Sequence, residues 1–281
     1  GIELEVGYKL SVDKVNLSFL ANASYVKNEI KNLGNQTGYI DKESLPTLGT
    51  VSRNENGYPI GYFFGYKAIG VFQTQEEIDS YISPATGKPI QPNAAPGDTK
   101  FEDLNGDGVI SDDNEDRTMI GKPNPDWMVG LTVAADWNGF DLSAFFQGSF
   151  GADVFDALRR YELAAVNYTS DALERWTGPG TSNSMPRIVL GDTPKNFRPS
   201  TLLVHDASFL RLRNLQVGYT LPAQLTRKAY IQRLRFYASF DNLLTITGYK
   251  GMDPEIGSTM GIDKGVYPQA RVYTFGLNLT F

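Results

Sequence analysis

The amino-acid sequence predicts an all-β fold built from antiparallel strands, and three observations support this prediction. Aromatic residues make up 12% of the 281 residues, glycines number 28 and cysteine is absent, a composition that suits a β-rich chain with many turns. Several segments alternate apolar and polar residues, which is the period of an extended strand. Short turn signals separate some of these segments.

About seven segments show the alternation, each roughly ten residues long. In the first, Leu4 and Val6 alternate with Glu3 and Glu5, so one face is apolar and the other polar. Only residues 11–14 separate it from the second segment, which predicts a hairpin. The predicted strands span residues 2–10, 15–25, 127–137, 140–147, 209–221, 234–245 and 272–281.

Three local features refine these strands. Asn138 and Gly139 form the strongest short hairpin signal, because both central residues of a type I′ turn need a positive φ. Leu20 is an apolar residue on an otherwise polar face. Near Asn214 the alternation changes phase, which predicts a β-bulge.

The spacing of the strands favours a transmembrane antiparallel β-barrel. Strands of about ten residues can cross a bilayer at a tilt, and no run of about 18 apolar residues predicts a membrane helix. Short turns at 11–14, 137–139 and 222–230 interleave with long connections, as short periplasmic turns do with long extracellular loops. We expect the long extracellular loops to span residues 28–125, 150–206 and 246–268.

The alternative fold is a soluble β-sandwich, whose strands also alternate. It would make the chain a calcium-stabilised binding or adhesion domain. Connections as long as residues 28–125 are uncommon in compact soluble domains, which weighs against the sandwich. A bacterial single-chain barrel normally has an even number of strands, so we expect further strands before residue 1.

Two segments within the long loops suggest helices. Thr74 and Glu77 stand at capping-box spacing and predict one short surface helix. The segment 153–166 is the second candidate, with a packing role.

Charge and composition exclude several classes of function. The formal net charge is -6, whereas nucleic-acid binders are more often basic, so no nucleic-acid partner is expected. Without cysteine there is no disulfide, thiol nucleophile or thiolate metal site. His205 is the only histidine, so a histidine-clustered metal site is excluded within this chain.

An acidic segment, “FEDLNGDGVISDDNED”, resembles a calcium-binding loop. Its oxygen-bearing residues alternate around two glycines, as the 1, 3, 5 and 7 positions of an EF-type loop require. Asn114 stands where a bidentate Glu would close the site, and neighbouring acidic residues could substitute for it. A metal-free acidic turn is the alternative, and the Pro- and Gly-containing flanks argue against a calcium sensor. The candidate ligands of a structural calcium ion are Asp103, Asn105, Asp107, Val109, Asp112 and Asp116.

The remaining motifs give little support for catalysis. Carboxylate pairs such as Asp112 and Asp113 suggest a surface glycan hydrolase as one further class, but no nucleophile, base and orienting group can be assembled. We therefore expect no enzyme activity. Trp176, in “RWTGPGTSNSMP”, is a weak candidate for stacking on a sugar or peptide, and loop packing is its alternative role.

Several longer motifs then follow one another: “DWMVGLTVAADWNGFDLSAFFQGSFGADVF”, “ASFLRLRNLQVGYTLP”, “LRFYASFDNLLTITGYKGMDPE” and the terminal “YPQARVYTFGLNLTF”. In this order they resemble the SusC/RagA family of TonB-dependent outer-membrane transporters of Bacteroidota. The acidic loop departs from the family, which commonly has a shorter spacing before the pair at Asp116 and Arg117.

The resemblance implies an outer-membrane, multi-pass barrel of about 22 strands, of which this chain would be the last seven. It also implies a SusD-like surface lipoprotein as partner and import of oligosaccharides or peptides. TonB would supply the energy through an N-terminal plug, and neither the plug nor a TonB box is in this sequence.

Within such a barrel the apolar strand faces would contact outer-membrane lipid. Aromatic residues near strand ends would form the interfacial girdles, and the charged faces would line the lumen or contact the plug. The girdle candidates are Trp127, Trp137, Tyr219 and Tyr273, and the lumen candidates are Arg211, Arg213, Arg235 and Asp241.

Overall fold

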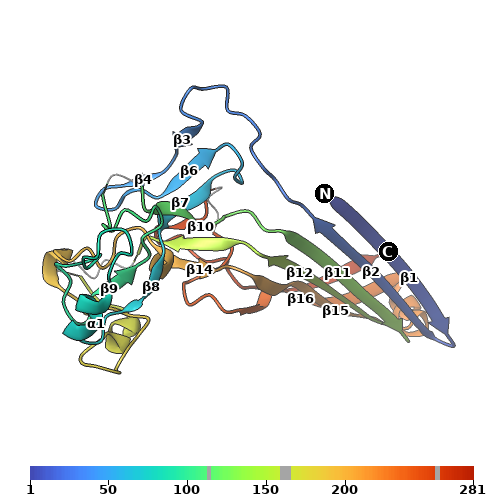
Figure 1. The fold of residues 1–281 in the computed structure, drawn as a ribbon. Coiled ribbons are helices and arrows are strands. Elements are labelled where there is room, and N and C mark those ends of the chain that lie inside the picture. Colours follow the sequence, from blue (N-terminus) through green and yellow to red (C-terminus); the bar gives the residue numbers. More distant parts are fainter. Residues whose placement is uncertain (113–114, 159–165, 257–259) are drawn as a thin grey trace.

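The computed structural model describes residues 1–112, 115–158, 166–256 and 260–281. It has two parts, a long open sheet and a head built from the three long connections (Figure 1). Within the described residues, no helix is long and apolar enough to cross a membrane.

Seven antiparallel strands form the sheet, which we call the wall, and they are the seven that alternation predicts. Their order in the wall is their order in the chain, so every neighbour is a sequential partner. This confirms the all-β prediction. The strands are β1 (Ile2–Val12), β2 (Val15–Tyr25), β11 (Trp127–Trp137), β12 (Phe140–Phe150), β15 (Phe209–Thr220), β16 (Arg233–Thr247) and β18 (Val272–Thr280).

The register of the wall follows the local sequence signals. The β11–β12 turn has positive φ at Asn138 (48°) and Gly139 (86°), as a two-residue hairpin turn requires. Phe145 and Phe146 of β12 pair with Asn214 and Leu212 of β15, so Arg213 is an extra residue in the ladder. The predicted bulge is therefore confirmed, and it turns two successive side chains, those of Arg213 and Asn214, to the same face.

One face of the wall is apolar and exposed. Leu4 is 63% exposed and Phe275 is 75% exposed, whereas the buried hydrophobic side chains lie mostly in the head. No second sheet of described residues packs on this face, so the β-sandwich alternative has no support. The exposed face includes Ile2, Leu4, Val6, Tyr8, Phe19, Leu131, Leu142, Val217, Phe236, Phe275 and Leu277.

The described residues of the head form short strands in four small sheets. The largest has the order β10-β7-β6-β3, the next is β14-β13-β17, and the pairs β4-β5 and β8-β9 complete the set. The strands are β3 (Tyr39–Asp41), β4 (Ser44–Leu45), β5 (Gly49–Thr50), β6 (Ser52–Glu55), β7 (Tyr62–Tyr66), β8 (Ala68–Val71), β9 (Thr99–Phe101), β10 (Arg117–Gly121), β13 (Asp153–Asp156), β14 (Val204–Asp206) and β17 (Ile262–Asp263).

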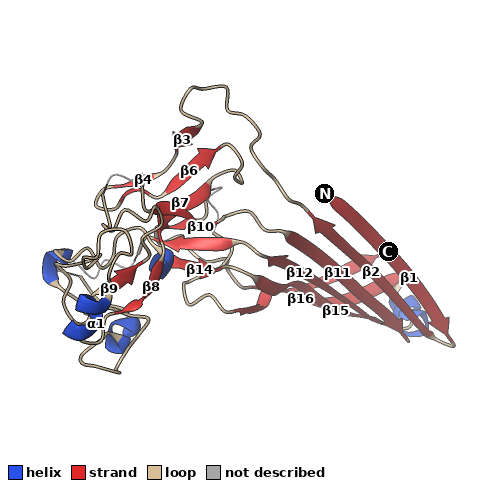
Figure 2. Ribbon diagram, in the orientation of Figure 1, coloured by secondary structure: helices blue, strands red, loops and turns tan. Residues whose placement is uncertain are grey.

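Helices are short and lie in the head or at the short-turn end of the wall (Figure 2). At α1 the predicted cap is present, because the Glu77 amide donates to Thr74 Oγ1 at 3.3 Å. The predicted helix at 153–166 is wrong at its start, where β13 pairs with β14 and β17 instead; residues 159–165 lie outside the described residues. The helices are α1 (Gln75–Ser80), α2 (Ala223–Thr226), η1 (Ser170–Glu174), η2 (Leu190–Asp192), η3 (Thr201–Leu203) and η4 (Arg227–Ala229).

The three long connections share one hydrophobic core. Val51 and Phe63 come from the first connection, Phe155 and Leu203 from the second, and Ile262 from the third. All five side chains are at most 3% exposed. Burying side chains of this size stabilises a fold by about 1.5–3 kcal/mol each, so the connections form one packed unit rather than separate loops.

Candidate functional site

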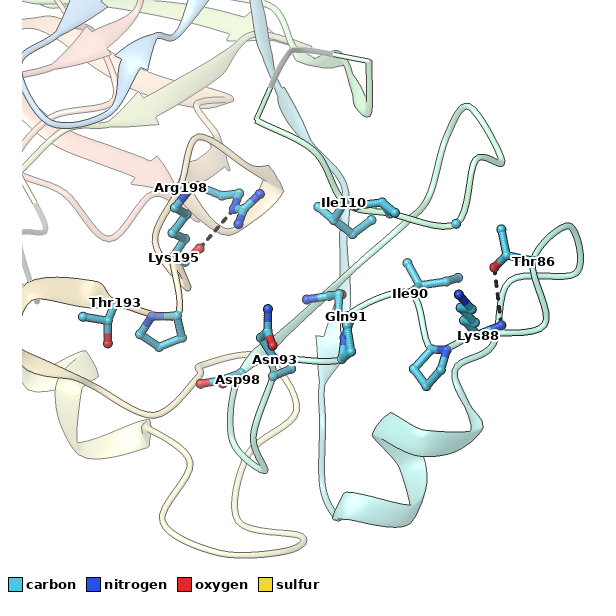
Figure 3. Close-up of a pocket in the computed structure, with 16 residues that line it drawn as sticks. Thr86, Lys88, Ile90, Gln91, Asn93, Asp98, Ile110, Thr193, Lys195 and Arg198 are labelled. Carbon is cyan, nitrogen blue, oxygen red and sulfur yellow. Dashed lines mark hydrogen bonds between the residues drawn. The ribbon is translucent and has the colours of Figure 1, made fainter.

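The head contains two neighbouring cavities, which we take as the candidate functional site. The larger, of about 690 Å³, lies among residues 86–94, Gly108 to Ile110 and residues 193–198 (Figure 3). The smaller, of about 450 Å³, lies beside Tyr66, Asp112 and Arg117. Lys195 and Arg198 line both cavities, and we call them the shared basic pair.

The acidic loop, residues 103–116, contributes Gly108, Val109 and Ile110 to the lining of the larger cavity. Asp103 accepts hydrogen bonds from the backbone amides of Gly106 (2.8 Å) and Gly108 (2.9 Å). Asp107 accepts from the amide of Val109 at 2.8 Å. Carboxylates that bond to their own following amides organise tight turns, so these side chains shape the loop whether or not a metal binds.

Only part of the predicted ligand set comes together. Asn105 Nδ2 donates at 3.0 Å both to Asp107 and to Glu115. Asp112 instead forms an ion pair with Lys195. Within the described part of the chain, no three His, Asp or Glu side chains gather as a metal-binding group. Asn114, at the predicted closing position, lies outside the described residues, so the calcium site stays a prediction.

Asp116 connects the segments of the acidic loop through hydrogen bonds. Its carboxylate is fully buried and accepts hydrogen bonds from the amides of Leu104 (3.1 Å) and Ser111 (3.0 Å). The two ends of the loop are thus held by one side chain. A buried carboxylate is stable there because backbone donors satisfy it.

Arginines alternate with aromatic rings in a series that includes Tyr66, Arg117 and Arg198 of the smaller cavity. Arg53 lies 3.6 Å from the ring centre of Phe64, Arg117 lies 4.3 Å from the same ring, and Arg198 lies 4.7 Å from Tyr66. Such cation–π contacts are favourable, more so where the charge is shielded from water. We call this series, with Tyr39 and Phe101 at its ends, the arginine–aromatic stack.

Burial changes the acid–base behaviour within the stack. It lowers the pKa of Arg117 from its ordinary value, although Arg117 stays charged and donates to the carbonyls of Phe64 and Thr50. Burial also raises the pKa of Tyr66, whose hydroxyl donates to the Ser111 carbonyl at 2.7 Å. The stack therefore supports both the acidic loop and the shared basic pair.

Trp176 makes packing contacts in the head, and its role in binding a solute stays a prediction. Its indole Nε1 donates to Gln73 Oε1 at 3.1 Å, and its ring lies on Gly97, where a Cβ would overlap it. Gly97 has a φ of 91°, so glycine is favoured there for conformation as well as for space. Trp176 lines neither of the two cavities of the candidate site.

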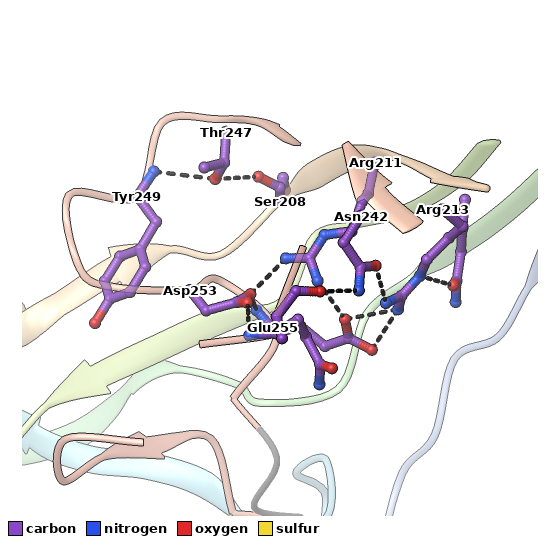
Figure 4. Close-up of polar contacts among 11 residues, drawn as sticks. Ser208, Arg211, Arg213, Asn242, Thr247, Tyr249, Asp253 and Glu255 are labelled. Carbon is purple, nitrogen blue, oxygen red and sulfur yellow. Dashed lines mark hydrogen bonds and ion pairs between the residues drawn. The ribbon is translucent and has the colours of Figure 1, made fainter. Parts of the chain in front are cut away.

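A second polar cluster joins the third connection to the polar face of the wall (Figure 4). Arg211 donates to Asp253 at 2.5 Å and to Glu255 at 3.1 Å. Arg213, the bulge residue, donates to both oxygens of Glu255 at 2.6 Å and to Gln147 at 2.6 Å. Reasoning from the sequence assigned the arginines to a lumen face but missed their partners, which the motif “DPE” contains.

The cluster is a buried tether. Arg211 is 2% exposed and Asp253 is 7% exposed. Burial by itself raises the pKa of Asp253, but hydrogen bonds from the amides of Gln269 and Glu255 and from Arg211 outweigh it and hold that pKa below 3.8. A carboxylate whose pKa is lower in the folded state than in the unfolded state stabilises the fold at pH values above its unfolded-state pKa. The contribution of Asp253 is therefore present at neutral pH and is lost as the pH falls below about 4.

Replacing Asp253 by Asn should loosen the third connection. Removing one partner of a buried ion pair leaves Arg211 poorly compensated and costs about 3 kcal/mol. Hydrogen exchange measured by mass spectrometry should show faster exchange in residues 246–256. Lys264→Met is the matched control, because Lys264 pairs with Glu43 at an exposed site worth less than about 1 kcal/mol. Equal protection in the two variants would contradict the tether.

Comparison with known proteins relates the whole chain to one family. No family model matches the chain. It is 34% identical over 236 residues to TonB-dependent receptor P3 of Formosa agariphila, covering 80% of this chain and 22% of that protein. It is 30% identical over 287 residues to TonB-dependent receptor SusC of Bacteroides thetaiotaomicron, covering 100% of this chain and 26% of that protein. The chain thus spans about a quarter of the length of these curated relatives.

Solved structures give the same relationship. The RagAB peptide transporter matches with a TM-score of 0.75 and 27% identity, covering 99% of this chain and 28% of that chain. The open-open state of the RagAB peptide importer matches with a TM-score of 0.73 and 26% identity, covering 99% of this chain and 28% of that chain. The wall is thereby confirmed as a portion of an antiparallel β-barrel, while the total of about 22 strands stays a prediction. In sequence and in fold, the chain belongs with the SusC/RagA-like TonB-dependent receptors, of which it matches one segment.

Proposed function

We propose that this chain forms part of the barrel wall and the extracellular head of an outer-membrane importer. The observation that carries the proposal is the distribution of apolar side chains. The wall exposes a continuous apolar face, whereas the head has an ordinary buried core. A surface of this kind is stable where lipid rather than water covers it.

The dimensions of the wall support a membrane setting. β2, β11 and β12 have 11 residues each. At about 3.3 Å per residue and a tilt of about 45°, such a strand rises about 26 Å, close to the apolar band of outer-membrane barrels. Longer strands such as β16 continue beyond this band into the head.

Aromatic residues lie near both ends of the wall strands. Trp127 packs on Tyr25 at the head end, with ring centres 4.9 Å apart. At the short-turn end, Phe140 lies between Trp137 (6.2 Å) and Tyr219 (4.4 Å). Aromatic rings favour the membrane–water interface, so these clusters support two girdles.

The opposite face of the wall carries paired charges and amides. Arg235 Nε donates to Asp141 at 2.9 Å, and Asn214 donates to Asp241 at 2.6 Å. Side chains of this kind favour a solvated lumen or a contact with a plug.

We further propose that the chain acts with the partners that SusC-like proteins use. These are a SusD-like surface lipoprotein at the extracellular mouth and TonB, acting through a plug. The solute would be an oligosaccharide or a peptide, and the RagAB structures are described as those of a peptide transporter and importer. The relatives are described as receptors or transporters, which supports a role in uptake rather than in catalysis.

A charge on the apolar face should destabilise the wall in the membrane. Leu131→Arg, near the middle of β11, should cost about 2–4 kcal/mol, as charged residues do at the bilayer midplane. Thr132→Arg, the next residue on the polar face, is the matched control and should cost much less. Unfolding by urea in lipid vesicles measures both. Similar losses for the two variants would argue against a lipid-facing surface.

Copurification tests the importer itself. Outer membranes should be extracted in detergent, and everything that purifies with this chain should be identified by intact mass and sequencing. The expected result is a polypeptide that contains these residues after a plug domain, together with a surface lipoprotein. Recovery of a lone soluble chain of 31.1 kDa would overturn the proposal.

We also propose that the acidic loop binds a structural calcium ion. Asp103, Asn105 and Asp107 carry the oxygen donors, and the amides they hold fix the direction of the remaining lone pairs. Of the acidic residues near the end of the loop, Glu115 accepts a hydrogen bond from Asn105, and Asp112 forms an ion pair with Lys195 of the shared basic pair. Bound calcium would hold the loop against the larger cavity.

Calorimetry on the detergent-solubilised protein tests this calcium site. We expect a binding heat that Asp103→Ala and Asp107→Ala each abolish, because each substitution removes a carboxylate ligand of the calcium ion. Asp79→Ala, an acidic residue in α1 outside the loop, is the control and should leave the heat unchanged. If the unaltered protein gives no heat, the loop is a metal-free turn.

A further inference from the structure

The shared basic pair is an exception in an acidic protein. The formal net charge of the chain is -6, yet Lys195, Arg198 and Arg117 all line the smaller cavity. Two carboxylates line it as well. Asp192 accepts from the amides of Asn196 and Phe197 at 2.8 and 2.9 Å, so Asp112 is the carboxylate that faces the basic residues.

Arg198 is held in place by several contacts, while one of its hydrogen-bond donors, Nη1, is not used within the described residues. Its Nε donates to the Lys195 carbonyl at 3.2 Å, and its guanidinium lies 4.7 Å from the ring centre of Tyr66 and 4.9 Å from that of Phe101. Nη1 is buried and makes no hydrogen bond to the described residues. The nearest acidic oxygen, Asp112 Oδ1, is 3.8 Å away, which is too far for one. A buried donor in this state favours any acceptor that can reach it.

Asp112 is the acidic residue beside Arg198 Nη1, but it makes no hydrogen bond to it. Its side chain is 66% exposed and pairs with Lys195, whose side chain is 52% exposed. Exposed ion pairs are weak and are readily exchanged for other partners. The carboxylate of Asp112 is therefore a displaceable counter-ion beside a fixed guanidinium.

The larger cavity indicates what could approach this pair. The described residues that line it include Ile90, Val109 and Ile110, prolines, and the amides Gln91 and Asn93, and none of these described lining residues is aromatic (Figure 3). Apolar surface with a few polar groups suits an organic solute of moderate size. A guanidinium whose Nη1 makes no hydrogen bond to the described residues, with a neighbouring ammonium, recognises a carboxylate in particular.

We infer that the shared basic pair binds a carboxylate of the solute, and that Asp112 is the internal carboxylate which the solute displaces. The inference rests on the proposed function for its biological role, since the solute would be the one imported. Two solute classes carry the group: a peptide, at its C-terminus or an acidic side chain, and an acidic oligosaccharide, at a uronic acid. The binding chemistry is the same for both.

Calorimetry on the detergent-solubilised protein, with four probes, tests the site. The acidic probes are N-acetyl-trialanine and trigalacturonate, and the matched neutral probes are N-acetyl-trialanine amide and galactotriose. Binding of an acidic probe at least about tenfold tighter than its neutral match supports the site, and the acid that binds identifies the solute class. Equal binding of the acidic and neutral probes, or no binding of either acid, would overturn the inference.

Substitutions separate recognition from structural support. Arg198→Gln should weaken binding of the acid about tenfold or more, whereas Asp112→Asn should tighten it, up to about fivefold, by removing the competitor. Arg233→Gln, an exposed arginine at the short-turn end, is the control and should change nothing. A merely structural role for Asp112 predicts weaker or unchanged binding in Asp112→Asn, and that result would overturn the inference.

Two further readouts keep the outcome clear. If Arg198→Gln does not fold, Lys195→Gln replaces it, since Lys195 is exposed; its binding should also fall about tenfold. Binding in detergent does not depend on uptake. An outer-membrane importer that ignores both acids would refute this site alone, and a soluble protein that binds them would refute the proposed function alone.

Discussion

The unbroken pairing of seven neighbouring strands is the constraint on which the rest of the structure depends. Because side chains alternate along each strand, a fixed register places every second residue of a strand on one face, and the bulge at Arg213 restores the alternation where β15 changes phase. The β1–β2 and β11–β12 hairpins keep a one-to-one register throughout. A continuous apolar face and a continuous polar face are the result, and both the lipid contact and the solvated passage that we propose need that continuity.

The head converts this wall into a defined site. Its core draws on all three long connections, so the cavities have walls from segments far apart in the sequence. The ion pairs from Arg211 and Arg213 to Asp253 and Glu255 attach the third connection to the wall. The bulge at Arg213 lets the polar side chains on both sides of it, those of Arg211 and Asn214, share one face without ending the strand.

Much of the fold was predictable from the sequence, and the site much less so. Period-two alternation found all seven wall strands, and the change of phase near Asn214 located the bulge, because both are local signals. The head is set by contacts between distant residues. Thus segment 153–156 pairs as a strand with residues 204–206 and 262–263, where local pattern suggested a helix. Likewise Asp112 pairs with Lys195, 83 positions away, which no spacing rule indicates.

The arginine–aromatic stack has a consequence for the surroundings in which the head can work. Dissolved ions weaken exposed charge pairs such as Lys31 with Glu29, because the charges are reached by counter-ions. In the stack, the arginine guanidiniums lie against the faces of buried aromatic rings, where counter-ions have little access. Phe64 and Tyr66, at 3% and 4% exposure, are shielded in this way. On the proposed function the head would lie on the outer surface of a cell, which faces whatever salinity its habitat imposes, and this part of the head would keep its shape from fresh water to brine.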